Sequence, residues 1–372
     1  MKIAVDLRSL SSGYVSGVEN YILNLLDQML KLDKSNSYLL FYNAFQRKSL
    51  GDFHYVNSQI ISSRYPNKIL NLGLKAGLIS FEKLIGEFDV LFMPNPNQFC
   101  LESKARLVVT AHDLSPLVTP GYYDLKRRLW HKFLNYGKIF ERADAIAAVS
   151  DYTKYDLVRL LGVSENKIST IHPGVNAGIF TPEQPSSQLR QVRNQYGLPG
   201  DYMLFLNTLE PRKNLQNLLK AFEMLDQDTF LVIAGKPGWK YRGLLKKIRQ
   251  SKKRHKIRML GYVPEKHKPA IIKMSKFLVY PSFYEGFGFQ PLEAAACGKP
   301  SVISGVSSLP EILGEASLLV NPHSAHELLK AFRLLLTDTA LAESLSQKAR
   351  QKALAYTWEA TAKKTLQLIT QS

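Results

Sequence analysis

The sequence predicts two doubly wound α/β domains in tandem, each with a parallel sheet covered by helices on both faces. Its 372 residues exceed one ordinary hydrophobic core and suit two domains. Along the whole chain, short runs rich in Val, Ile and Leu alternate with longer stretches of helical period. The runs are continuously apolar, as is typical of parallel strands that are buried on both faces.

These apolar runs are the predicted strands. In the first half they are KIAVDL, YLLFYN, VLFMP, RLVVTA, AIAAVS and KISTIH. In the second half they are YMLFLN, FLVIAG, IRMLGYV, KFLVYP, PSVIS and SLLVN. Helices are expected between them, for example over residues 18–30 and 125–140. Residues 181–200 have little apolar content and carry Pro, Ser and Gly near their ends, so we interpret them as a linker after a first domain at 1–180.

The composition indicates a globular protein of a reducing compartment, so we expect it in the cytoplasm. Hydrophobic residues make up 45% of the chain and charged residues 22%. Cys100 and Cys297 are too few for a disulfide framework or a cysteine-based zinc site. The first apolar run contains Asp6 and Arg8, which argues against a signal peptide, and no apolar stretch is long enough to span a bilayer.

The charge balance is strongly basic, with 49 Lys and Arg against 31 Asp and Glu and a net charge of +18. Such a field favours a partner that carries phosphate: a nucleic acid, an anionic lipid or a nucleotide. The strands lack the interleaved aromatic and basic residues of a nucleic-acid binder, and we find no reading helix, so we expect no nucleic-acid partner.

The stretch YEGFGFQPLEAAACGKP, residues 284–300, holds two carboxylates eight positions apart, Glu285 and Glu293. It follows a predicted strand, and its two glycines permit a close backbone approach to a ligand. Pro291 suits the first turn of a helix that ends at Gly298, and the amides of that turn favour phosphate. A long ligand could have a sugar at one glutamate and a ribose at the other. The alternative is an ordinary connection with one solvated and one capping acid.

Three further motifs follow predicted strands. In FLNTLEPRKNL, Arg212 and Lys213 precede a helix, where cations oppose the helix dipole, so we favour a diphosphate site over a plain helix start. In VVTAHDLSP, His112 could donate to a sugar or phosphate oxygen, or could simply bond a neighbouring carbonyl. Gly13 and Gly17 after the first strand are a weak phosphate-loop signal.

Two basic segments and one acidic pair are less specific. Residues 239–258 are interpreted as a solvated helix face, and the pair Asp226 and Asp228 as a turn rather than a metal site. In residues 124–140 a predicted apolar stripe runs beside basic side chains. The stripe consists of Leu125, Leu129, Phe133, Tyr136 and Phe140. It indicates either a helix packed on its sheet or a helix at an anionic membrane surface.

In this order the motifs resemble those of the retaining glycosyltransferases of family four, which have the GT-B fold of two Rossmann-like domains. The resemblance covers nearly the whole chain. Its pieces are the glycine loop around Gly17, TAHDLSP, AAVSDYTKYDL, HPGVN, LEPRKNL, YVPEKHKPAIIKMSKFLVYPSFYEGFG, PLEAAACGKPSV and SSLPEI. It implies an acceptor-side domain at 1–180, a nucleotide-sugar-binding domain at 181–356, and a C-terminal helix at 357–372 that crosses back to the first domain.

The resemblance also implies roles for individual residues. Glu293 would bind the ribose of the donor, and Glu285 would contact the transferred sugar or act as a covalent nucleophile. Arg212 and Lys213 would bind the diphosphate, and alanine at both is expected to abolish turnover with the fold intact. The other residues at the donor would be Gly17, Val263, Gly286, Phe287, Gly288 and Phe289, with His112 near the sugar.

Two positions depart from the family pattern. Gln290 stands where many members have proline, and Thr208 stands where many have an arginine. The LEPRKN motif is similar to that of bacterial mannosyltransferases, which makes GDP-mannose the first expected donor and a UDP-sugar the second. The implied reaction is retaining, front-face transfer of a hexose to a glycan or lipid-linked acceptor without a metal or other cofactor. A nucleotide-sugar epimerase of the same fold remains the alternative.

Overall fold

The computed structural model describes residues 1–12, 17–44, 53 and 55–371. These residues form two compact units. Unit 1 comprises Met1–Leu114, Lys126–Gly174 and Trp358–Ser372, and unit 2 comprises Ser115–Leu125 and Val175–Thr357. The division after Gly174 is earlier than the expected one after residue 180, since Val175 N donates to Tyr356 O of unit 2. Residues 115–125 group with unit 2, where Trp239 Nε1 donates to Tyr122 O over 2.7 Å.

Unit 1 has a parallel sheet with the strand order β3-β2-β1-β4-β5-β6-β7. Its strands are β1 (Lys2–Asp6), β2 (Ser37–Asn43), β3 (Ser58–Ser63), β4 (Val90–Met93), β5 (Arg106–Ala111), β6 (Ala145–Ala148) and β7 (Ile168–Thr170). Its helices are η1 (Arg8–Ser12), α1 (Gly17–Leu32), α2 (Asn67–Lys75), α3 (Phe81–Ile85), α5 (Leu125–Leu134), α6 (Tyr136–Arg142), α7 (Asp151–Leu161), η3 (Glu165–Lys167) and α16 (Trp358–Thr370). All six strands predicted in the first half of the chain are present.

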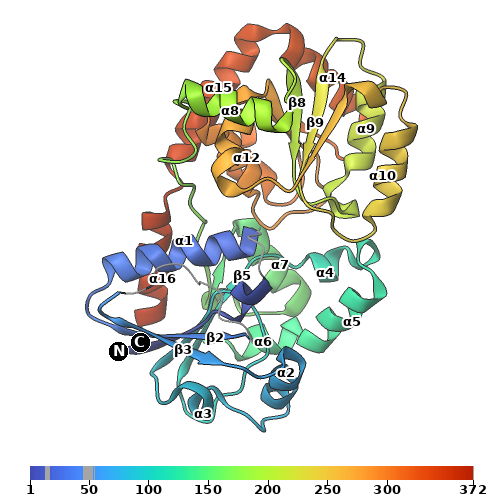
Figure 1. Ribbon diagram of the computed structural model, residues 1–372. Coiled ribbons are helices and arrows are strands. Elements are labelled where there is room, and N and C mark those ends of the chain that lie inside the picture. The colour runs from blue at the N-terminus through green and yellow to red at the C-terminus, as the bar shows by residue number, and fades with distance from the viewer. Residues whose placement is uncertain (13–16, 45–52, 54, 372) are drawn as a thin grey trace. The chain divides into compact units, whose positions relative to one another are not determined.

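The last helix of the described chain, α16, belongs to unit 1 and lies beside α1 (Figure 1). The ring of Trp358 at its start meets the ring of Tyr21 on α1 edge-on, with centroids 5.8 Å apart. At its other end, Arg106 of β5 donates to the carbonyl oxygens of Leu368 and Ile369, which have no partner inside the helix. Residues from the two ends of the sequence therefore complete one core.

Unit 2 has a parallel sheet with the strand order β10-β9-β8-β11-β12-β13. Its strands are β8 (Tyr202–Leu206), β9 (Phe230–Ala234), β10 (Ile257–Gly261), β11 (Phe277–Tyr280), β12 (Ser301–Ser304) and β13 (Leu318–Val320). Its α-helices are α4 (Ser115–Val118), α8 (Ser186–Tyr196), α9 (Leu215–Glu223), α10 (Tyr241–Gln250), α11 (Lys268–Met274), α12 (Phe289–Ala296), α13 (Leu309–Ile312), α14 (Ala325–Thr337) and α15 (Thr339–Leu354). Its 3-10 helices are η2 (Pro120–Tyr122), η4 (Pro211–Lys213), η5 (Arg254–Lys256), η6 (Glu265–His267) and η7 (Gly314–Ala316). All six strands predicted in the second half are present.

The prediction of a linker at residues 181–200 was wrong, because α8 occupies most of it. Pro185 precedes this helix, and Gly197 ends it in the left-handed conformation with a φ of 56°. The helix belongs to unit 2, where Val192 is buried and Arg258 of β10 donates from Nε to the carbonyl oxygen of Tyr196. A helix with so little apolar surface does not show in the hydrophobic pattern.

The prediction of one helix over 125–140 was also wrong. Asn135 adopts the left-handed conformation, with a φ of 55°, and divides the segment into α5 and α6. The expected stripe is buried only in α6, at Phe140, while Leu125 and Leu129 of α5 are exposed. In the described residues, no helix is both long and apolar enough to cross a membrane.

Candidate functional site

The candidate site lies where the strand order of the unit 2 sheet reverses. β8 and β11 are neighbours in the sheet, and the chain leaves them towards opposite sides. The loops after two such strands leave room for a ligand at their carboxyl ends. The loop after β8 carries Arg212 and Lys213, and the loop after β11 carries Glu285. The topology thus brings together residues that are more than 70 positions apart.

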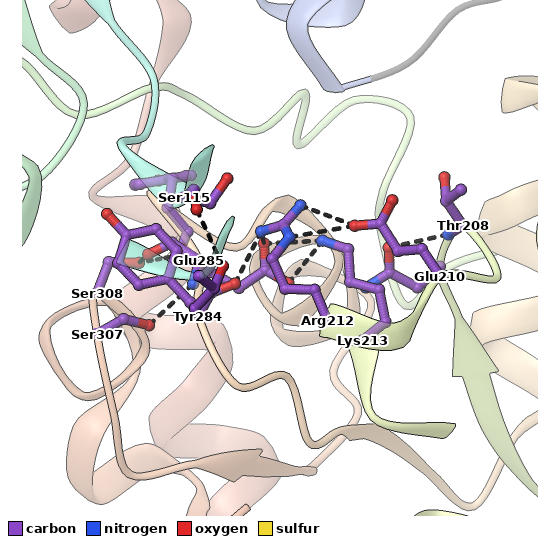
Figure 2. A network of polar contacts seen from close by, with 12 residues as sticks. Ser115, Thr208, Glu210, Arg212, Lys213, Tyr284, Glu285, Ser307 and Ser308 are labelled. Carbon is purple, nitrogen blue, oxygen red and sulfur yellow. Dashed lines mark hydrogen bonds and ion pairs between the residues drawn. The ribbon is translucent and has the colours of Figure 1, made fainter. Parts of the chain in front are cut away.

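Glu285 forms a buried ion-pair cluster with both of these cations (Figure 2). Lys213 Nζ lies 2.7 Å from Glu285 Oε1 and 2.9 Å from Oε2. Arg212 donates to Glu285 Oε2 over 3.2 Å and to the carbonyl oxygen of Tyr284 over 2.7 Å. Burial alone would raise the pKa of Glu285, but Lys213 and Arg212 outweigh it and lower that pKa to about 2. The carboxylate is therefore ionised at every physiological pH.

Glu210 is a second acid in this cluster that the sequence reasoning did not single out. Its Oε1 accepts from Arg212 Nε over 3.1 Å, so the guanidinium bridges two carboxylates. Burial raises the pKa of Glu210, and the neighbouring cations offset only part of that effect. The LEPRKNL motif contained the signal, because a glutamate two residues before an arginine at a loop can pair with it.

Two serines fix the loop that carries Glu285. Ser307 Oγ accepts from Glu285 N over 3.0 Å, and Ser308 Oγ donates to the carbonyl oxygens of Glu285 and Phe287 over 3.0 and 2.8 Å. Both serines follow β12, which is the next strand in the sheet after β11. They belong to the SSLPEI motif, to which the sequence reasoning had assigned no role.

Asn214 fixes the loop that carries the two cations. It adopts the left-handed conformation, with a φ of 59°, between η4 and α9. Its side-chain amide donates to Pro281 O over 2.9 Å and to Pro322 O over 2.6 Å. The loops after β8 and β11 are thereby joined directly next to Lys213, which keeps the cation in place.

Gly288 is the point at which the loop after β11 enters α12. It has a φ of 114°, a conformation that L side chains rarely adopt. A Cβ atom at this position would lie 2.7 Å from Leu309 Cδ2. The predicted helix is confirmed, with Pro291 in its first turn, and it ends before Gly298, whose φ is 67°. The amides of residues 287–289 are at the start of this helix.

Replacement of Gly288 by alanine is expected to destabilise the protein by about 1–3 kcal/mol, since backbone strain and the contact with Leu309 add together. Gly243 in α10 provides a matched control, because its new Cβ would meet nothing within 4 Å. Alanine there is expected to stabilise the helix by about 0.5–1 kcal/mol. Urea unfolding of both variants checks the opposite signs. An equal effect of the two substitutions would contradict the strain at Gly288.

Glu293, one turn inside α12, is buried in a different environment from Glu285. Its Oε2 has no hydrogen-bond partner among the described residues. Burial raises the pKa of Glu293 to about 7, and the ammonium group of Lys268 offsets only part of this effect. Lys268 is itself held 2.6 Å from Glu265 Oε2. The site therefore contains one acid that is held ionised and one that titrates near neutrality.

Gln290 in the first turn of α12 extends this site. Tyr280 at the end of β11 donates from its hydroxyl group to Gln290 Oε1 over 3.1 Å. The hydroxyl remains protonated, because burial raises the pKa of Tyr280 well above its usual value. The carboxamide is thus oriented with its oxygen towards Tyr280, and its NH2 group is left as a donor at the start of the helix.

The other predicted site residues lie elsewhere. His112 follows β5 of unit 1, where its Nε2 is 2.7 Å from Pro94 O and its ring meets Tyr21 edge-on. Burial lowers the pKa of His112, so the neutral imidazole donates to that carbonyl. The bond to a neighbouring carbonyl was one of the two alternatives given for His112 from the sequence. The other alternative, a contact with a sugar or phosphate oxygen, stays a prediction.

Gly17 is the first residue of α1, whereas Gly13 lies outside the described residues. Val263 is buried in unit 2 after β10. The acids of the LDQD turn form ion pairs at the surface, Asp226 with Arg333 and Asp228 with Lys256. The roles of Gly17 and Val263 at a donor remain predictions.

Comparison with known proteins identifies the family. A family model described as "Glycosyltransferase Family 4" matches residues 15–179, and one described as "Glycosyl transferases group 1" matches residues 190–352. O-antigen chain mannosyltransferase B of Escherichia coli is 33% identical over 270 residues, which are 71% of this chain and 70% of that protein. The chain belongs to glycosyltransferase family 4. It is a glycosyltransferase, and its resemblance to bacterial mannosyltransferases is confirmed.

A further curated relative and two solved structures are more distant. Serotype-specific mannosyltransferase WbdA of Escherichia coli is 27% identical over 263 residues, which cover 69% of this chain and 32% of that protein. This glycosyltransferase thus spans about a third of that relative's length. Sucrose-phosphate synthase from Thermosynechococcus elongatus shares the fold with a TM-score of 0.77 at 22% identity, over 99% of this chain and 98% of that one. WaaG, a glycosyltransferase involved in lipopolysaccharide biosynthesis, has a TM-score of 0.74 at 16% identity over the whole of both chains. The predicted GT-B fold is confirmed.

Proposed function

We propose that this glycosyltransferase moves mannose from GDP-mannose to a glycan or lipid-linked acceptor, with retention of the anomeric configuration. The observation that carries the proposal is the cluster of Arg212 and Lys213 around Glu285 at the switch point of the unit 2 sheet. The mannosyltransferases among its relatives support mannose as the sugar. A UDP-sugar is the second candidate, since a solved structure of the same fold, HepE of Anabaena, contains UDP and glucose.

The leaving group of this reaction is a nucleoside diphosphate, and the cluster suits its developing charge. Arg212, Lys213 and the amides at the start of α12 would neutralise the phosphate oxygens, so the reaction would need no metal ion. The bond between the anomeric carbon and the diphosphate breaks while the bond to the acceptor oxygen forms on the same face. The acceptor's proton passes to the leaving phosphate oxygen. Glu285, ionised beside the sugar, would stabilise the positive charge on the sugar ring.

Glu293 would accept hydrogen bonds from the ribose hydroxyls, which would satisfy Oε2, the oxygen that has no partner among the described residues. Gln290 would donate its NH2 group to the sugar or to a phosphate oxygen. A lipid-linked acceptor would bring the protein to the inner face of a cytoplasmic membrane. Such contacts would give separate roles to an acid that two cations keep ionised, Glu285, and to an acid whose pKa is raised by burial, Glu293.

A thermal-shift screen with GDP-, UDP-, ADP- and dTDP-sugars tests the donor, because a ligand that binds only the folded state raises its melting temperature. GDP-mannose is expected to produce the largest shift, and a chelator such as EDTA should not reduce it. Transfer of labelled mannose, with the anomeric linkage read by NMR, then tests the reaction. Free epimerised nucleotide sugar as the product, or inversion at the anomeric carbon, would overturn the proposal.

A further inference from the structure

Unit 1 has an exposed surface on which apolar and basic side chains are mixed. We define the α2–α5 surface as the exposed side chains of residues 64–78, which include α2, and of α5. Ile69 and Leu72 on α2 are each 59% exposed, and on α5 Leu129 is 58% and Trp130 40% exposed. Residues 125–130, the first six residues of α5, are all exposed to solvent. Large apolar side chains gathered in this way mark an interaction site.

The structure joins the two helices into one surface. Lys75 at the end of α2 donates to Phe133 O over 2.5 Å, and its Nζ lies 4.0 Å from the centre of the Phe133 ring. Leu72 lies three residues before Lys75, and Lys68 lies seven residues before Lys75. This spacing places all three residues on the face of α2 next to α5.

A buried arginine behind the surface also holds the two helices together. Arg8 donates to Asn71 Oδ1 of α2 over 3.0 Å and to Gln98 O over 2.7 Å. The side chain of Gln98 in turn donates to the carbonyl oxygens of Phe133 and Leu134 at the end of α5. The surface is therefore supported by buried polar contacts and is not a pair of loosely attached helices.

The charge of the surface selects its partner. Residues 64–78 and 125–134 contain seven Lys and Arg and no Asp or Glu. A second copy of this chain would place these positive charges against each other, which disfavours a symmetric dimer. A nucleic acid would satisfy the charges but not the exposed Ile69, Leu72 and Leu129. Anionic headgroups above an acyl layer match both kinds of side chain.

We propose that the α2–α5 surface binds an anionic lipid bilayer. Its basic side chains contact the headgroups, while Ile69, Leu72, Leu129 and Trp130 enter the boundary with the acyl chains. Both signals are needed, since neither charge nor a few apolar side chains alone gives stable binding. The inference deepens the proposed function, because it gives the surface through which a lipid-linked acceptor would be reached. It does not depend on the identity of the donor.

Sedimentation with lipid vesicles tests this inference on the whole chain. The protein is expected to bind vesicles that contain phosphatidylglycerol, to bind vesicles of phosphatidylcholine alone weakly, and to be released by high salt. Arg128→Gln with Lys132→Gln is expected to weaken binding by about fivefold for each charge removed. Leu129→Ser with Trp130→Ser is expected to weaken it at least as much.

Matched controls lie in unit 2. Leu334 of α14 is 46% exposed, and Lys246 and Lys247 of α10 are exposed basic residues. Leu334→Ser and the pair Lys246→Gln with Lys247→Gln are expected to leave vesicle binding unchanged. Equal losses in controls and test variants, or equal binding to neutral vesicles, would overturn the inference. A change of oligomeric state in the test variants would instead assign the surface to a second copy.

The GDP-mannose thermal shift separates this inference from the proposed function. It is expected to be unchanged in the variants of the α2–α5 surface, because these residues lie outside the donor site. Loss of vesicle binding with an intact thermal shift supports the surface alone. Normal vesicle binding, together with no change of melting temperature on addition of nucleotide sugars, would contradict the proposed donor but not the membrane-binding surface.

Discussion

Lys213→Met is expected to reduce transfer by a factor of about 100 to 1,000, as the loss of one preorganised charge at a transition state does. It should also destabilise the folded protein by about 3–5 kcal/mol, because the buried Glu285 loses the ammonium group 2.7 Å away. Alanine at Arg212 and Lys213 was expected from the sequence to leave the fold intact. The burial of both side chains now argues against that expectation.

A compensating substitution separates the two effects. In the double variant Lys213→Met with Glu285→Gln the loss of the ammonium group is matched by the loss of the carboxylate charge, so stability is expected to recover while transfer stays lost. Urea unfolding and initial rates with labelled donor measure the two quantities. Recovery of transfer in the double variant would mean that neither the ammonium group of Lys213 nor the carboxylate of Glu285 is needed for transfer. Lys246→Met on the exposed face of α10 is the control and should change neither quantity.

The free energy of unfolding at acidic pH should depend on the ion pairs of Glu285. The folded-state pKa of Glu285, about 2, lies below the ordinary value of 4.5. The stability that the ion pairs contribute is therefore present above pH 4.5 and is lost as the pH falls towards 2. Lys213→Met should flatten this loss, because the remaining cation lowers the pKa of Glu285 less.

Glu293→Gln is expected to stabilise the protein at pH 8 and to weaken donor binding. The pKa of Glu293 is raised from 4.5 to about 7, so the folded protein binds more protons than the unfolded chain between these values. Stability therefore falls as the pH rises from about 4.5 to 7. A neutral amide avoids this loss but is a poorer acceptor for two ribose hydroxyls.

Melting temperatures between pH 4.5 and 8, together with calorimetric titration of GDP-mannose, check both parts. The variant should match the parent protein at the acidic end and exceed it at pH 8. The parent's affinity should fall below pH 7, since its ribose contact needs the ionised acid, whereas the variant's affinity should vary little with pH. Glu343→Gln, at an exposed position of α15, is the control. Lower stability of Glu293→Gln at pH 8 would contradict the raised pKa.

The strands of the fold could be predicted from the sequence because they are buried on both faces. Every continuously apolar run became a strand, from Lys2–Asp6 to Leu318–Val320. The strand that was missed, β3, has the sequence SQIISS and lies at the sheet edge, where it is only partly buried. The break at Asn135 was missed because the apolar spacing continues through it, and only the backbone conformation interrupts the helix.

The members of the candidate site could be predicted, but their pairing could not. Arg212, Lys213 and Glu285 were identified from their local motifs, and the cations were assigned to a diphosphate. That they hold a buried Glu285 depends on the adjacency of β8 and β11, which the sequence does not show. Likewise, Lys268 lies 25 positions before Glu293 and meets it only through the packing of α11 and α12.

The position of α16 has a consequence for biosynthesis. This helix completes the core of unit 1 around Tyr21, yet the ribosome makes it only after all of unit 2. Part of the apolar interior of unit 1 therefore stays uncovered until residues 358–370 have been translated. Chaperones that bind exposed hydrophobic segments would act on unit 1 during that interval. Premature termination before Trp358 would leave unit 2 with its complete core and unit 1 without α16.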